Sequence, residues 1–192
     1  MLSLRTTTEE ELMSQYAAGD DIASRQLFAL LTPQLRAFFL RSFMDPALAD
    51  DLMQTTFLRL HRARSSYIPE LPLKPWVFTI AASVRRDELR RRYRLPPHVS
   101  EVELEQAESR FVGDVTTGRE TDGARDIDAA RAAIERLPES QRAVIHLHCQ
   151  EELTFEQIAE VLGTTPGAVR VRASRAYERL RRDLRAYIKR GD

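Results

Sequence analysis

Two histidines close to two glutamates are the residues of this sequence that most resemble a metal site. His146 and His148 stand two residues apart, and Glu151 and Glu152 follow them. On a helix, side chains at positions i and i+2 point in different directions, so both imidazoles cannot readily bind one ion. We therefore interpret them as ordinary helix histidines and expect no metal.

Other candidate catalytic groups are arranged no better. Asp50 and Asp51 are adjacent and would diverge on a helix, which disfavours an acid/base pair. The single cysteine, Cys149, excludes an internal disulfide and a cysteine-based zinc site within one chain, and we expect it to be buried as a small apolar side chain. The sequence contains no P-loop, no G-x-S-x-G and no glycine-rich phosphate cradle. It predicts a protein that is not an enzyme and needs no cofactor.

Arginines gather in two separate stretches and suggest a phosphate-bearing partner instead. The 192 residues carry 29 basic and 29 acidic side chains, but the two signs are segregated. Arg85–Arg94 holds six arginines and two acids, and Arg170–Arg190 holds nine basic residues and two acids. Between them, Val99–Asp128 holds nine acids and three arginines. This pattern predicts two basic modules joined by an acidic connector.

The second basic stretch overlaps a pattern typical of a helix-turn-helix. Within Thr154–Arg175, Ala159 supplies the small residue that closely crossing helices need. Gly163, four residues later, tolerates the positive φ of the turn, and Val169 anchors the second helix. An αα-hairpin with a merely solvated charged face remains the alternative. The face expected to meet phosphates and base edges consists of Arg170, Arg172, Ser174 and Arg175.

Helices must position these residues, because only 7 of the 192 residues are glycine and the apolar residues recur at helical spacing. In the first half, Pro33 predicts a break or kink. Asp45-Pro46 predicts a helix start, since an acidic cap precedes a proline at the first helical position. Ser65–Pro75, with three prolines, predicts a loop, and Pro75 opens a further helix that runs to Arg94.

The second half shows equally clear signals for helix ends. A helix from about Asp126 is ended by Pro138, and the next spans Ser140 to Cys149. Thr154–Gln157 forms a capping box for a short helix, and Thr165-Pro166 begins a last helix towards Tyr187. The acidic connector is predicted to be a flexible linker with a short helix over Glu101–Arg110.

Three segments resemble one family, the extracytoplasmic-function sigma factors of bacterial RNA polymerase. Asp45–Leu60 is similar to the family pattern D-A-E-D-L-x-Q-E-x-F-L. Pro75–Ala81, followed by Asp87, is similar to W-L-x-x-I-A…D. Leu137–Arg142 is similar to L-P-x-x-Q-R, and Thr154–Tyr177 follows it as the helix-turn-helix. The resemblance implies an all-α fold of two small helical domains. It places σ2, a helical bundle, in residues 1–95, the acidic linker in 96–125, and σ4 with its helix-turn-helix in 126–192.

The resemblance also implies a role for each set of residues. Core RNA polymerase, through its largest and second-largest subunits, would be bound by Asp50, Asp51, Gln54, Phe57 and Leu58. The promoter's minus-ten element would be recognised and melted by Tyr67, Ser83, Arg86, Asp87 and Arg90, with Arg85, Arg91 and Arg92 completing a basic groove. The minus-thirty-five element would be read by Thr165, Gly167, Arg170, Val171, Arg172, Ser174 and Arg175, with Arg172 on a phosphate. Trp76 is expected in the core rather than on the DNA.

The sequence departs from the family pattern at Ser83, Val171 and Ser174, and also at Thr55. Ser83 stands where many members carry Asn, so base preference in the minus-ten element can differ. Thr55 replaces the usual acid after Gln54, which weakens one expected polymerase contact. Val171 and Ser174 prevent the minus-thirty-five consensus from being copied from relatives.

The resemblance implies further partners and a cellular location. It implies an anti-sigma factor, often membrane-bound, that holds both domains until a signal arrives. We expect a cytoplasmic protein without direct membrane insertion, since no apolar run approaches the ~20 residues of a membrane span and Met1–Glu11 lacks a signal-peptide core. The alternative is a stand-alone helix-turn-helix repressor or activator, which would leave Asp45–Arg94 without a role.

Overall fold

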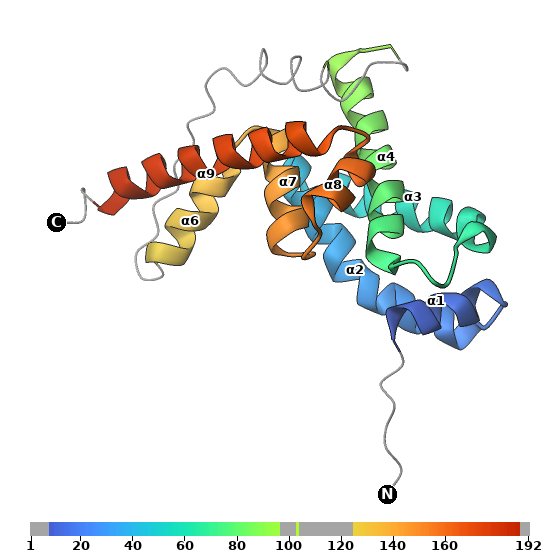
Figure 1. Ribbon diagram of the computed structural model, residues 1–192. Helices are drawn as coiled ribbons and strands as arrows, with labels where there is room; N and C mark the ends of the chain where they lie inside the picture. Colours follow the sequence, from blue (N-terminus) through green and yellow to red (C-terminus); the bar gives the residue numbers. More distant parts are fainter. Residues whose placement is uncertain (1–7, 97–102, 104–124, 189–192) are drawn as a thin grey trace, which may run out of the picture.

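The regular structure is helical throughout the part of the chain that is described. The computed structural model describes residues 8–96, 103 and 125–188 (Figure 1). A first helical group consists of α1 (Glu9–Ala17), α2 (Asp21–Phe43), α3 (Pro46–Ala63), the 3₁₀ turn η1 (Arg64–Ser66) and α4 (Leu73–Tyr93). A second helical group consists of α6 (Arg125–Glu135), α7 (Glu139–Cys149), α8 (Phe155–Leu162) and α9 (Pro166–Ile188). The all-α prediction is confirmed.

Side-chain caps explain where the helices of the first group begin. Asp45 accepts a hydrogen bond from the Leu48 amide at 3.1 Å, and Pro46 occupies the first position of α3, as predicted. Asp20 accepts from the Ile22 amide at 2.7 Å and so caps α2. Each cap satisfies amides that have no partner inside the helix.

Two prolines do not mark helix ends where the sequence predicted them. Of the break or kink predicted at Pro33, the break is wrong, because α2 runs through Pro33 from Asp21 to Phe43, and the kink stays a prediction. The buried side chains Leu27, Leu31 and Leu35 lie on both sides of Pro33, and their packing offsets the hydrogen bond that proline removes. Similarly, α4 begins at Leu73 rather than at Pro75.

The helix-turn-helix is formed as the sequence predicted. Thr154 and Gln157 make both hydrogen bonds of the capping box that begins α8. Gly163 ends α8 at φ +66°, a left-handed conformation that glycine adopts without a Cβ penalty. Thr165 Oγ1 accepts from the Ala168 amide at 3.2 Å at the start of α9. The unit has a small buried core: Ile158, Ala159, Leu162 and Val169.

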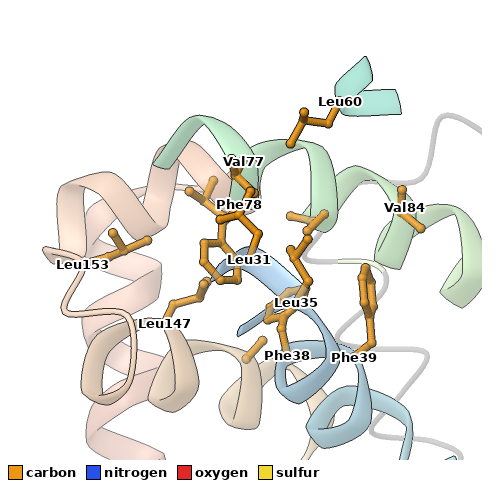
Figure 2. Packing of buried hydrophobic residues seen from close by; sticks show 14 of the residues in the cluster. Leu31, Leu35, Phe38, Phe39, Leu60, Val77, Phe78, Val84, Leu147 and Leu153 are labelled. Carbon is orange, nitrogen blue, oxygen red and sulfur yellow. The ribbon is translucent and has the colours of Figure 1, made fainter. Parts of the chain in front are cut away.

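One hydrophobic core joins the two helical groups, which the sequence did not predict. Figure 2 shows Phe38 of α2 and Phe78 of α4 lying with Leu147 of α7 in a single cluster. Leu153 and the buried residues of α8 extend the same cluster. The two groups therefore pack directly on each other instead of meeting only through a connector.

The connector itself falls largely outside the described residues. The expected helix over Glu101–Arg110 and the predicted linker flexibility lie there, so both stay predictions. The division into residues 1–95, 96–125 and 126–192 likewise stays a prediction.

Candidate polymerase and nucleic-acid interfaces

The residues expected to bind polymerase lie together on one side of α3. At 100° per residue, Asp50, Asp51, Gln54, Phe57 and Leu58 fall within about a third of the helix circumference. We call these five residues the α3 surface. Asp51 and Gln54 are exposed, and Leu58 is 61% exposed, which is unusual for a leucine in a helix that also buries Leu52 and Leu60.

The other two residues of the α3 surface have partners within the chain. Asp50 pairs with Arg36 Nε at 2.7 Å, and both side chains remain more than 40% exposed. Such an exposed pair contributes little to stability, so Asp50 stays available to another partner. Phe57 is half-buried, with its ring centroid 4.6 Å from that of Phe28. The α3 surface is thus an apolar patch with carboxylates beside it.

The loop before α4 presents different side chains from the one expected. Tyr67 is only 7% exposed, because its ring packs 5.2 Å from Trp76 and its hydroxyl donates to the Leu71 carbonyl at 2.7 Å. Tyr67 is therefore a residue that supports the loop and does not present its ring to solvent. Ile68 and Leu71 are the exposed apolar side chains here, at 53% and 54%. Trp76 packs against the core, as the sequence indicated.

Three residues expected at the minus-ten element form one network on the outer face of α4. Arg59 of α3 donates to Ser83 Oγ at 3.0 Å and to Asp87 Oδ2 at 2.8 Å. Arg90 donates to Asp87 Oδ1 at 3.4 Å. Sequence reasoning missed Arg59, because its spacing marks it only as a residue away from the buried stripe of α3.

Arg85 does not belong to an open basic groove, which corrects the sequence-based expectation. Its side chain is 1% exposed and forms a two-pronged ion pair with Glu139 of α7, itself buried. Arg85 lies four residues after Ala81 and four before Leu89, both of them buried. Helical spacing places all three on the inner face of α4, a signal that the run of neighbouring arginines obscured.

The remaining arginines of α4 have distinct surroundings. Arg86 Nη1 lies 3.4 and 3.2 Å from the carbonyl oxygens of Val161 and Leu162 at the end of α8, where helix carbonyls favour a cation. Arg91 is exposed and pairs with Glu88 at 2.7 Å. Arg92 is exposed and lies 5.1 Å over the Phe43 ring. Only the last two match a solvated basic surface.

The outer face of α9 carries most of the residues expected at the minus-thirty-five element. These residues are exposed: Thr165, Gly167, Arg170, Val171, Ser174 and Arg175. Arg170 pairs with Glu156 of α8 at 2.5 Å. Arg172 is the exception and a correction, since it is 2% exposed and does not lie on this face. It follows Val169 by three residues and shares the buried side of α9 with Ala176.

The histidines face different partners. His146 Nδ1 lies 2.8 Å from Arg41 Nη1, and its Nε2 lies 3.4 Å from Glu151. His148 Nδ1 lies 3.0 Å from the Leu153 carbonyl oxygen. Across residues 8–96, 103 and 125–188, no three histidine, cysteine, aspartate or glutamate side chains are grouped to hold a metal ion. Cys149 is exposed, which is opposite to the expectation, and its Sγ lies 3.5 Å from the Tyr177 hydroxyl.

The buried His146 makes stability depend on pH. Burial, and to a smaller extent the charge of Arg41, lower the pKa of His146 from 6.5 to about 3. Between these pH values the unfolded chain binds one more proton than the folded chain. The free energy of unfolding therefore falls as the pH falls, by up to about 1.4 kcal/mol per pH unit from this group.

Urea unfolding of the chain between pH 5 and 6.5 checks this prediction. His146→Gln should reduce the dependence of the free energy of unfolding on pH. An unchanged dependence would contradict the prediction. Glu151 faces His146 and is paired with Lys74 at 3.6 Å; burial raises the pKa of its carboxyl. This shift acts in the opposite direction, since stability from Glu151 falls as pH rises, so the comparison must be between variants at each pH.

Comparison with known proteins identifies the family to which the two helical groups correspond. Residues 27–95 match the family described as Sigma-70 region 2, and residues 127–180 match Sigma-70, region 4. The RNA polymerase sigma factor CarQ of Myxococcus xanthus is 33% identical over 172 residues, covering 88% of this chain and 93% of CarQ. The ECF RNA polymerase sigma factor SigM of Mycobacterium tuberculosis is 30% identical over 184 residues, covering 96% and 88%.

Two solved structures share the fold. The sigma factor RpoE of Bartonella quintana, in complex with the anti-sigma factor NepR, aligns with a TM-score of 0.62 and 27% identity over 84% of this chain and 96% of that chain. CnrH, in complex with the cytosolic domain of CnrY, aligns with a TM-score of 0.59 and 28% identity over 93% and 97%. None of the described helices is long and apolar enough to cross a membrane. This chain therefore belongs to the extracytoplasmic-function sigma factors, the alternative sigma factors that direct transcription.

Proposed function

We propose that this sigma factor binds core RNA polymerase through the α3 surface. The observation that carries the proposal is the exposed Leu58 beside Asp51 and Gln54. An exposed apolar side chain with carboxylates at its border suits a basic, partly apolar partner surface. The largest and second-largest polymerase subunits are the partners that the family membership suggests.

The DNA-binding part of the proposal assigns two promoter elements to two helices. The exposed face of α9, with Arg170, Ser174 and Arg175, reads the minus-thirty-five element in the major groove. The side of α4 that carries Arg86 and Arg90 holds the melted minus-ten strand. The protein itself performs no catalysis in this scheme, which assigns the chemistry to the polymerase.

Use of the α4 face requires the two helical groups to move apart. Arg86 contacts carbonyl oxygens of α8, and Arg85 is held by Glu139. The buried Arg85 guanidinium cannot meet DNA while its contact persists, and Nη1 of Arg86 is held at the end of α8. RpoE and CnrH were solved with the partners NepR and CnrY. By analogy, we propose that this chain is cytoplasmic and is regulated by an anti-sigma factor of its own.

Transcription in vitro tests the proposal. Purified core polymerase is incubated with a promoter library, with and without the chain, and transcript start sites are sequenced. We expect specific initiation at sites that share two spaced elements. Absence of polymerase association, combined with tight duplex binding by the chain alone, would favour the stand-alone repressor or activator.

A charge reversal on the α3 surface localises the polymerase contact. Asp51→Arg should weaken polymerase binding by about tenfold or more, equivalent to at least about 1.4 kcal/mol. Glu160→Arg is the matched control, since it reverses an exposed acid on α8. Equal affinities for both variants would contradict a role of the α3 surface.

A further inference from the structure

Arg59 links the helix expected to bind polymerase with the helix expected to hold DNA. Its guanidinium donates through Nη1 to Ser83 Oγ at 3.0 Å and through Nη2 to Asp87 at 2.8 Å. The side chain of Arg59 remains 39% exposed, and that of Asp87 50%. Two of the five N–H donors of Arg59 are committed by these bonds, and the group stays open to solvent.

Ser83 is poorly suited to read a base, although its position matches a base-reading position of the family. A serine hydroxyl has one hydrogen, and Ser83 Oγ directs it to the Ile80 carbonyl at 2.7 Å. The same oxygen accepts the hydrogen bond from Arg59. Ser83 therefore holds Arg59 and has no hydrogen left to donate to DNA.

Asp87 is equally unsuited to face a phosphate by itself. A carboxylate repels the DNA backbone, but one oxygen of Asp87 accepts from Arg59 and the other from Arg90 at 3.4 Å. Two guanidinium groups around one carboxylate leave a net positive surface. Such charge-assisted hydrogen bonds also fix the orientation of the guanidinium planes.

The position of Arg59 on α3 allows it to act while polymerase is bound. At 100° per residue, Arg59 lies outside the arc occupied by the α3 surface, on the side that faces α4. A partner covering Asp51 and Leu58 would leave Arg59 accessible.

From these contacts we infer that Arg59 binds a backbone phosphate of the melted minus-ten strand, with Ser83 and Asp87 as positioning residues. The inference rests on the proposed function of the chain. The ligand is a phosphate because Arg59 presents a partly exposed guanidinium of fixed orientation, and a phosphate contact carries no sequence preference of its own.

Salt dependence of promoter binding tests the inference in the holoenzyme. Full-length chain and core polymerase are assembled, and binding to a DNA with a single-stranded minus-ten region is measured from low to high salt. Arg59→Gln should reduce the slope of log K against log salt by about 0.7 to 1, as expected for one lost phosphate contact. Its preference among minus-ten sequences and its affinity for core polymerase should match those of the unmodified chain.

Two further variants separate a phosphate contact from a structural bridge. Arg59→Lys keeps the charge but not the two-pronged geometry, and it should restore the salt slope. Arg25→Gln, which removes an exposed arginine of α2, is the matched control and should leave the slope unchanged.

The possible outcomes are distinct. An unchanged slope in Arg59→Gln, a slope that Arg59→Lys does not restore, or a changed preference at a minus-ten base would each overturn the phosphate assignment. Failure of the unmodified holoenzyme to initiate at any promoter would instead overturn the proposed function.

Discussion

Replacing Glu139 with alanine is expected to lower the free energy of unfolding by about 3–5 kcal/mol. Arg85 and Glu139 are almost completely buried between α4 and α7. Removing the carboxylate takes the charge of Glu139 and its two hydrogen bonds away from the buried Arg85 guanidinium, in a site that water reaches poorly, and the loss of this ion pair is the main cost. Urea unfolding of the full chain, followed by circular dichroism, measures the change.

A double variant separates the cost of breaking the ion pair from the net contribution of the pair to stability. Replacing both residues with leucine removes the two charges together, and buried pairs replaced in this way are often neutral in stability. We expect the double variant to recover most of the loss. A loss below about 1 kcal/mol in Glu139→Ala would show that the two helical groups separate readily.

Replacing Phe38 with alanine is the second change with a large expected effect, about 3–5 kcal/mol. Phe38 is fully buried where α2, α4 and α7 meet. Its ring centroid lies 5.3 Å from that of Phe39, 5.5 Å from that of Phe78 and 5.7 Å from that of His146. Alanine would leave a cavity between the two helical groups and remove these ring contacts.

Phe57→Ala is the matched control for this prediction. Phe57 is only half-buried and packs on Phe28 within the first helical group. The same loss of a phenyl ring should therefore cost less there, because part of the ring already contacts water. Equal losses in both variants would contradict a central role of Phe38 in joining the groups.

Helix ends were predictable because their determinants are local. The capping box of Thr154 and Gln157, the glycine at position 163 and the Asp45 cap each act within four residues of the helix end. No distant part of the chain is needed to form them. The same is true of the helix-turn-helix core, whose apolar spacing alone predicts the buried residues.

Helical spacing also predicted which faces would be exposed on α3 and α9. Asp51, Arg170 and Ser174 lie at the surface as expected. The prediction failed where the charge of a side chain was taken as a sign of exposure to solvent. Arg85 and Arg172 stand in register with buried apolar residues, and they follow that register rather than their charge.

The sequence by itself determined the helices, the helix-turn-helix and the family, because these depend on short-range spacing. Only the tertiary structure decided the partners of the arginines. Glu139 lies 54 residues from Arg85, and Asp87 lies 28 residues from Arg59. The residue type arginine does not reveal whether its guanidinium contacts water, a buried carboxylate or DNA. Its role depends on which distant group packing brings to it: the packing of α3 on α4 for Arg59, and the core shared by the two helical groups for Arg85.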